Sequence, residues 1–87
     1  MNEKNYVLLG HQMFVGKETL FFRSTCKGIG GTAKLDEATR LTLIGAELNT
    51  IPPYDRTRGR GWEIIDVRST NQEQFSWLMD QESRSDF

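Results

Sequence analysis

The chain has 87 residues, of which 37% are hydrophobic and 26% are charged, and its formal net charge is -1. This length holds one domain, and the apolar content is too high for a disordered segment. A sequence pI near 5.8 disfavours a general nucleic-acid binder, which usually has a strongly basic domain.

The sequence also bears on compartment and domain organisation. No apolar run approaches the roughly 20 residues that a membrane-spanning helix requires, and the first residues lack the pattern of a signal peptide. The single cysteine cannot form a disulfide within the chain, which fits a reducing compartment. We therefore expect a cytoplasmic chain without membrane contact. One domain is expected over residues 1–83, followed by a polar tail at residues 84–87 that frays.

The first part of the sequence has the pattern of antiparallel strands. Short β-prone runs at residues 5–9, 12–15 and 18–26 are separated by glycine-containing breaks, which predicts a hairpin or a three-strand meander. Because side chains alternate across a strand, Phe21 points away from its neighbours and is expected to lie outside the main core. It is therefore a candidate interface residue.

Glycines at positions 28, 30 and 31 follow, and we expect them to break the sheet as a flexible connection. Gly28, Gly30 and Gly31 could instead form, with Lys27, a nest of backbone amides that holds one phosphate. The segment also matches the loose dinucleotide fingerprint G-x-G-x-x-G/A. A chain of this size with antiparallel strands has no room for the two βαβ halves of such a site, so no cofactor is expected.

Residues 32–49 carry apolar side chains at spacings of three and four, which predicts a helix that two prolines end. Its apolar stripe comprises Leu41, Ile44, Leu48 and Ile51. The threonines of this segment are weak helix formers, so a strand over residues 41–44 remains the alternative.

The loop that follows, residues 52–60, holds three arginines at alternate positions between prolines and glycines. Arg56, Arg58 and Arg60 would face one side of an extended loop, and their guanidinium groups suit phosphates and carboxylates. Tyr54 and Trp62 bracket them with rings that could stack on bases. This loop is the leading candidate ligand site. The alternative is a surface loop whose arginines pair with the acidic C-terminal region.

The last part of the sequence predicts a strand and then a helix. Residues 62–68 alternate well enough for an interior strand. A capping box follows at Thr70 and Glu73, or one residue earlier, and the helix is expected to run to about residue 82. Trp77 lies off the apolar stripe of this helix and is a second candidate interface residue.

Enzymatic chemistry has little support in the sequence, and we expect no catalytic residue. One cysteine and one histidine are too few for a soft-ligand metal site, so no metal is expected either. Cys26 is expected to be a core cysteine at a strand end, and His11 is expected to lie in a turn. Glu63 and Asp66 are better explained as markers of an edge strand or as partners of a nearby arginine than as acid–base catalysts.

Together these patterns predict an α+β domain of two layers, with an antiparallel sheet of three to four strands and two helices packed on one face. The expected function is that of a small non-enzymatic binding or adaptor protein. We expect it to form a homo-oligomer, a dimer, and to recognise a protein or anionic ligand through the arginine loop and exposed aromatic side chains. A nucleic-acid-binding protein that uses the same loop is the alternative, and a small enzyme is less favoured.

Overall fold

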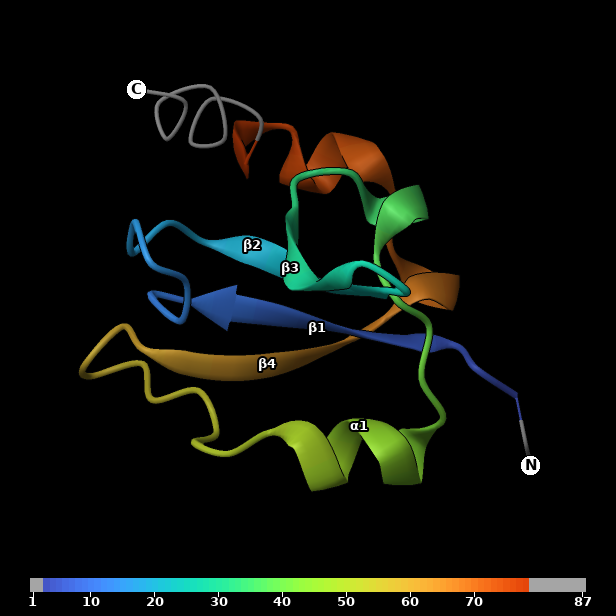
Figure 1. Ribbon diagram of the computed structural model, residues 1–87, viewed down its shortest axis with the longest axis horizontal. Coiled ribbons are helices and arrows are strands. Elements are labelled where there is room, and N and C mark those ends of the chain that lie inside the picture. Colours follow the sequence, from blue (N-terminus) through green and yellow to red (C-terminus); the bar gives the residue numbers. More distant parts are fainter. Residues whose placement is uncertain (1–2, 79–87) are drawn as a thin grey trace.

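The computed structural model describes residues 3–78 of the chain. Four strands form one antiparallel sheet, namely β1 (Tyr6–His11), β2 (Leu20–Thr25), β3 (Gly28–Thr32) and β4 (Gly61–Asp66). Their spatial order is β3, β2, β1, β4, so β3 and β4 are the two edges (Figure 1). The predicted antiparallel sheet is therefore present with four strands. The strand at residues 62–68 was expected in the interior, which is wrong, because β4 is an edge.

β1 is an interior strand that pairs with both β2 and β4, and its side chains are buried on both faces. Val7 and Leu9 point to one face and Leu8 to the other, and they are 0%, 2% and 1% exposed. Val7 lies opposite Ile65 of β4, and Leu9 lies opposite Phe21 of β2. An unbroken apolar run of this kind is typical of a strand that is covered on both sides.

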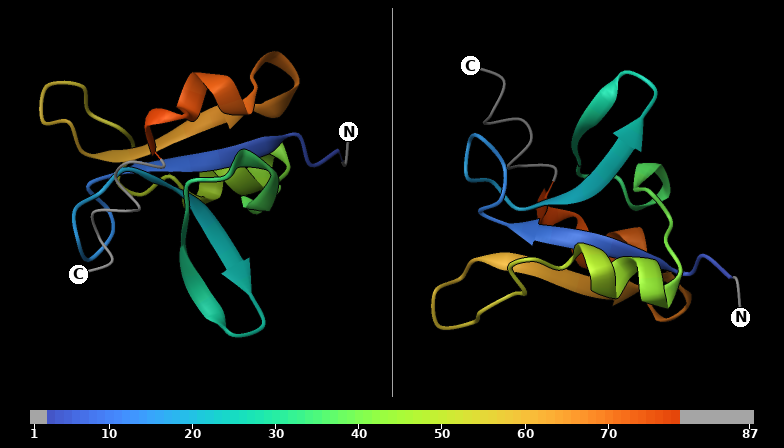
Figure 2. Two further views of the ribbon diagram at one scale, coloured as in Figure 1. Left: turned by 90° about the horizontal axis from the view of Figure 1, so that it is seen from above. Right: turned by 60° about the horizontal axis from the view of Figure 1, so that its bottom comes forward.

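The prediction of two helices packed on one face of the sheet is wrong. α1 (Leu43–Asn49) is the single α-helix that lies wholly within residues 3–78. The other helical segments that lie wholly within these residues are the 3₁₀ turns η1 (Leu35–Glu37), η2 (Val67–Ser69) and η3 (Gln72–Phe75). α1 lies against β1 on one face, whereas η1 and η3 lie against each other on the opposite face (Figure 1, Figure 2).

The long helix predicted over residues 32–49 is short because the backbone before it pairs with the sheet. The N–H of Thr39 donates to the carbonyl of Phe22 at 3.0 Å, and Leu41 exchanges hydrogen bonds of 2.7 and 3.0 Å with Tyr6. α1 begins only after Thr42, whose hydroxyl accepts a hydrogen bond from the N–H of Gly45. The weak helix formers thus occupy the extended stretch and the cap.

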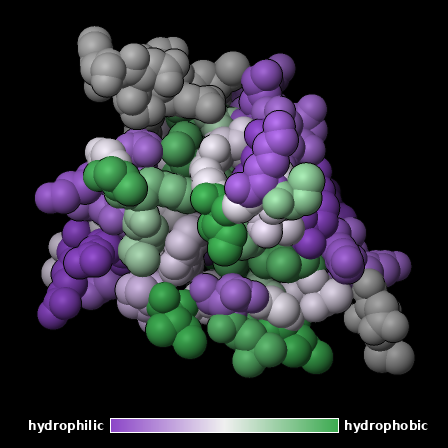
Figure 3. All heavy atoms as spheres, viewed as in Figure 1, coloured by the Kyte–Doolittle hydropathy of each residue, from purple (hydrophilic) through white to green (hydrophobic). Residues whose placement is uncertain are grey.

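Three of the four side chains in the apolar stripe of the predicted helix do not pack on the sheet. Ile44, Leu48 and Ile51 are 73%, 71% and 78% exposed, whereas Ala46 is fully buried. α1 therefore approaches β1 through a small side chain and turns its larger apolar side chains outward. Figure 3 shows such side chains gathered over α1, at the bottom of the molecule. We call Ile44 and Leu48, together with Ile51 just after the helix, the α1 ridge.

The glycine-rich segment is a strand, so the expectation of a flexible connection is wrong. β3 pairs with β2 from Gly28 opposite Thr25 to Thr32 opposite Phe21. Residues 26–27 form the turn between them, and the β2–β3 hairpin projects from the body of the molecule (Figure 2). The strand predicted at residues 12–15 is instead part of the loop between β1 and β2.

The main core lies on the face of the sheet opposite α1. Phe21 is fully buried there, so the expectation that it lies outside the core and forms an interface is wrong. Its ring meets that of Phe75 edge to face, with 5.1 Å between the centroids. Alternation did place Phe21 and Phe22 on opposite faces, but both faces of this sheet are covered. Burial could therefore not be assigned from alternation alone.

The predicted capping box forms one residue later than expected. Asn71 Oδ1 accepts a hydrogen bond from the N–H of Gln74 at 3.3 Å, and Gln74 Oε1 accepts one from the N–H of Asn71 at 3.1 Å. The turn that follows is η3, a 3₁₀ segment. Trp77 and Leu78 are helical, whereas residues 79–82 of the predicted helix and the tail at residues 84–87 lie outside the described residues.

Candidate functional site: the arginine loop

The arginine loop, residues 52–60, joins α1 to β4 and runs close beside the start of that strand. The N–H of Tyr54 donates to the carbonyl of Trp62 at 3.0 Å. Gly61 has a φ of 122°, and a Cβ there would collide with the carbonyl of Pro53. The loop and the strand therefore approach each other at a separation that a residue with a side chain would not allow.

Asp55 organises the turn that carries the arginines. Its N–H donates to the carbonyl of Arg60 at 2.8 Å, and its own carbonyl accepts from the N–H of Gly59 at 2.8 Å. Its carboxylate accepts from the N–H of Thr57 at 2.9 Å, which is an Asx turn. The side-chain amide of Gln12 adds a hydrogen bond of 3.0 Å to the carbonyl of Gly59. These bonds fix the backbone of the turn in the absence of a ligand.

The three arginine side chains line one open hollow of about 750 Å³. Arg58 Nε lies 3.7 Å from Asp55 Oδ2, and the two side chains are 82% and 49% exposed. Within residues 3–78, neither Arg56 nor Arg60 makes an ion pair. Asp55 is the single carboxylate among the lining residues that the structure describes, so three positive charges face one negative charge.

Tyr54 also lines the hollow, and its ring is stacked on that of His11. The ring centroids are 3.9 Å apart and the planes differ by 21°. His11 Nε2 lies 2.9 Å from Glu63 Oε1, and the imidazole is 15% exposed. The expectation that His11 lies in a turn is wrong, because it is the last residue of β1 and contacts the loop from there.

Trp62 does not line the hollow, although the sequence placed it beside the arginines. Its ring meets those of Phe14 and Phe22 edge to face, with centroids 5.8 and 6.0 Å apart. A Cβ at Gly10 would come within 2.7 Å of the indole, so the ring lies directly over β1. The indole thus packs in an aromatic cluster and is not available as a stacking platform.

The residues of the predicted phosphate nest lie in a different part of the molecule. Gly28, Gly30 and Gly31 belong to β3 and, with Lys27 and Arg23, line a second hollow of about 240 Å³ on the hairpin. A nest needs successive amides that point to one centre, whereas the amides of a strand alternate in direction. The backbone of β3 therefore does not have nest geometry.

The residues that suggested an enzyme are not brought together. Cys26 is exposed in the turn of the hairpin, so the expectation of a core cysteine is wrong. Glu63 pairs with His11, and Asp66 pairs with Arg68. In the part of the chain that the structure describes, no three potential metal-ligating side chains gather in one place.

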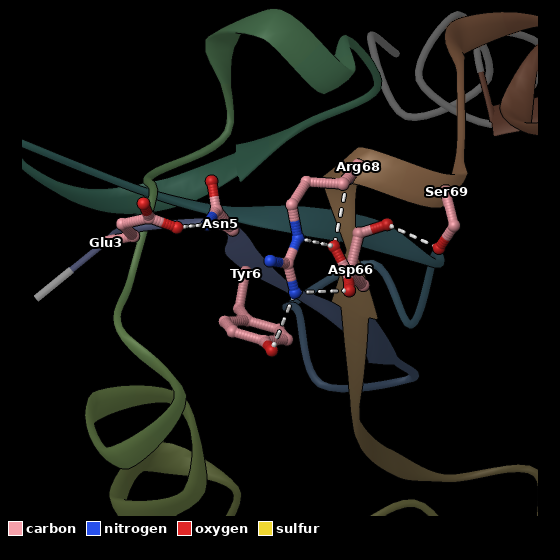
Figure 4. A network of polar contacts seen from close by, with 6 residues as sticks. All are labelled: Glu3, Asn5, Tyr6, Asp66, Arg68 and Ser69. Carbon is pink, nitrogen blue, oxygen red and sulfur yellow. Dashed lines mark hydrogen bonds and ion pairs between the residues drawn. The ribbon is translucent and has the colours of Figure 1, made fainter. Parts of the chain in front are cut away.

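Asp66 and Arg68 form a polar network at the end of β4 (Figure 4). Arg68 Nε and Nη2 donate to the two carboxylate oxygens of Asp66 at 3.0 and 2.9 Å, and Nη2 also donates to the hydroxyl of Tyr6 at 3.2 Å. These hydrogen bonds lower the pKa of Asp66 and raise the pKa of Arg68. The network explains Asp66 as an arginine partner, as the sequence predicted.

Two further surface features bear on partners. Trp77 is 46% exposed, and its indole N–H donates to the carbonyl of Gln74 at 3.2 Å. The α1 ridge is an exposed apolar surface that the sequence did not identify, because its spacing is equally typical of a buried face.

The site also contains residues that the sequence did not identify. His11 and Gln12 contact the arginine loop from the end of β1, and Gln12 lies 47 positions before Gly59. No local pattern indicates such a contact. The turn itself had a local signal, because aspartate two residues before threonine is typical of an Asx turn.

Comparison with known proteins found no family model, no curated protein and no solved structure that matches the chain. Residues 3–78 contain no helix with both the length and the apolar content to cross a membrane. The function is therefore inferred from the geometry and charge of the site.

Proposed function

We propose that this chain is a small binding protein that recognises an anionic group, a phosphate or a carboxylate, on its partner through the arginine loop. The observation that carries the proposal is that three arginines line one hollow with a single carboxylate among them. The backbone beneath them is hydrogen-bonded in place, so little backbone conformational entropy is lost when a ligand binds.

The charges of the hollow support an anion as the ligand. Arg56 and Arg60 make no ion pair within the described part of the chain, so an anion displaces no bound carboxylate from them. The contact of Arg58 with Asp55 is long and exposed, and such pairs contribute about 1 kcal/mol or less. Guanidinium groups can bind phosphate or carboxylate oxygens in a bidentate manner, which provides orientation as well as attraction.

A nucleic acid is the alternative ligand for the same hollow. Strands of nucleic acid bind tightly where several free aromatic rings stack on successive bases. One face of Tyr54 is occupied by His11, and Trp62 packs against Phe14 and Phe22. The lack of free rings at this site favours a compact anionic group over a base-stacked strand.

The proposal is tested by titrating the protein with inorganic phosphate and with an acidic peptide while amide NMR shifts are recorded. Shift changes are expected to concentrate at residues 54–60. Substituting alanine at Arg56, Arg58 and Arg60 is expected to reduce the affinity for both ligands at least about tenfold, since hydrogen bonds to charged groups contribute roughly 1.5–3 kcal/mol each.

A matched control removes the same charge elsewhere. Substituting alanine at Lys4, Lys27 and Lys34 changes the net charge equally but leaves the hollow intact. An equal loss of affinity in both triple variants would mean that net charge alone attracts the anion, and would overturn the proposal. A single-stranded oligonucleotide that binds more tightly than the peptide, with a steep salt dependence, would favour the alternative.

A further inference from the structure

β3 is an edge strand whose outer side bonds to no other segment of residues 3–78. The other edge strand, β4, is partly covered, because Trp62 exchanges hydrogen bonds with Pro52 and Tyr54 of the arginine loop. Unpaired N–H and C=O groups on an exposed edge are a template for pairing with another strand. The two edges of this sheet therefore differ in their capacity to bind a partner.

The hydrogen bonds of Thr39 establish which groups of β3 point outward. The N–H of Thr39 donates to the carbonyl of Phe22 at 3.0 Å, and Thr39 Oγ1 accepts from the N–H of Ser24 at 2.6 Å. The polar groups of these two β2 residues therefore point away from β3. In an antiparallel pair, two opposed residues that do not hydrogen-bond to each other both direct their N–H and C=O groups away from the partner strand. Gly31 and Ile29, which lie opposite them, thus present N–H and C=O on the free side of β3.

The side chains of β3 also leave this edge open. Ile29 is 76% exposed, and a Cβ added at Gly30 would meet no atom within 4 Å. Gly30 does not have a positive φ, so neither backbone conformation nor internal packing requires glycine there. Glycine weakens the interior of a strand, and its presence often marks a place where another backbone approaches closely.

We propose that β3 pairs antiparallel with β3 of a second copy of this chain, across a two-fold axis at Gly30. In this register Ile29 lies opposite the partner's Gly31, and the outward groups of both residues bond to each other. Gly28 lies opposite the partner's Thr32, so the whole of β3 is paired. The same contacts recur on the other side of the axis, as an isologous interface requires.

Side-chain fit favours a second copy over an unrelated peptide. A Cβ at Gly31 would lie 2.8 Å from Cε1 of Phe14, so the Phe14 ring covers this position. Opposed side chains of paired strands share one face of the sheet. The exposed Ile29 would therefore lie beside the partner's Phe14 and lose contact with water.

Charge also favours a second copy. The turn of the hairpin carries Lys27, and antiparallel pairing brings it toward the segment that follows β3 in the partner. That segment, residues 34–37, has one lysine and two carboxylates. Opposite net charges at the two ends of the paired strands support this orientation.

Light scattering coupled to size exclusion tests the proposal. The wild-type chain is expected to elute with twice its mass of 10.0 kDa. Ile29→Pro removes an outward N–H that β2 does not use, so it is expected to give a monomer with an unchanged circular dichroism spectrum. Ile44→Ser is the control, because it removes an isoleucine that is 73% exposed on α1, and it is expected to remain a dimer.

Hydrogen exchange on the wild-type chain keeps the test independent of how the proline variant folds. The amides of Ile29 and Gly31 are expected to become protected as the concentration rises from micromolar to millimolar, and to lose this protection on dilution. A chain that remains monomeric with both amides unprotected would overturn the proposal. A dimer that Ile44→Ser abolishes, or that persists in a folded Ile29→Pro variant, would also overturn it and would assign the interface to another surface.

Discussion

The rings of His11 and Tyr54 stack with their centroids 3.9 Å apart, which connects the last residue of β1 to the arginine loop. Glu63 of β4 contacts the imidazole, with 2.9 Å between Glu63 Oε1 and His11 Nε2. The position of the hollow therefore depends on these two side-chain contacts as well as on the turn. A loop held in this way keeps the backbone that carries the arginines in one arrangement.

Tyr54→Ala is expected to destabilise the fold by about 1 kcal/mol and to weaken anion binding, because a stacked aromatic pair contributes roughly 0.5–1.5 kcal/mol. Tyr54→Phe keeps the stacking face and is expected to behave as the wild type in both respects. Chemical denaturation and phosphate titration measure the two effects. A phenylalanine variant that is as impaired as the alanine variant would show that the hydroxyl, not the ring, matters.

Gly61→Ala is expected to destabilise the fold by more than about 2 kcal/mol, because its backbone is left-handed and its Cβ would meet backbone atoms of the loop. Gly30→Ala is the matched control in the same sheet. Its Cβ enters open space within a single copy of the chain, so in the monomer, at micromolar concentration, replacing this glycine is expected to raise the stability by up to about 1 kcal/mol. Thermal unfolding of both variants decides the comparison. Equal losses in the two would contradict the close approach at Gly61.

Phe21→Ala is expected to cost about 3–5 kcal/mol, since its side chain is fully buried against the core. Ile44→Ala changes an apolar side chain that is 73% exposed and is expected to shift the stability by less than about 0.5 kcal/mol. Urea denaturation of both variants measures the difference. A large loss at Ile44 would indicate that the α1 ridge is covered in solution.

Local patterns predicted the strands better than the helices. Alternation and turn residues located β1, β2 and β4, because each strand is a short run between breaks. β3 was not predicted, because glycines in a sequence indicate only that the backbone can adopt many conformations. In this chain they pair with β2 and form a strand. The helix over residues 32–49 failed because a non-local pairing of Thr39 and Leu41 with the sheet prevents helix formation there.

The candidate site was predictable in its charge but not in its support. Arginines at alternate positions between prolines and glycines can be identified in the sequence, and so can the Asx turn of Asp55. The contacts of His11 and Gln12 come from a strand far away in the sequence and exist only once the sheet is formed. The sequence predicted Trp62 at the site because it is close to the arginines along the chain. Its ring instead packs on Phe14 and Phe22, and this packing depends on how the strands pair.

Asp66 is expected to make stability dependent on pH at the acid end. Hydrogen bonds from Arg68 lower the pKa of Asp66 from its ordinary value of 3.8. Because the folded-state pKa lies below the unfolded-state value, this pair stabilises the native state above pH 3.8. The contribution is lost as the pH falls through the folded-state pKa, since the unfolded chain then binds the proton more readily.

Asp66→Asn removes this titrating group while an amide oxygen remains to accept the hydrogen bond that caps η2. The free energy of unfolding is therefore expected to fall less steeply with decreasing pH below 3.8 in the variant than in the wild type. Ser69→Ala is the control, because it removes a hydroxyl that donates to the carbonyl of Asp66 without removing a titrating group, and it is expected to leave the slope unchanged. Urea denaturation at several acidic pH values measures these slopes. If Asp66→Asn leaves the slope of the wild type intact, the carboxylate binds protons equally in both states and the bidentate contact with Arg68 is absent in solution.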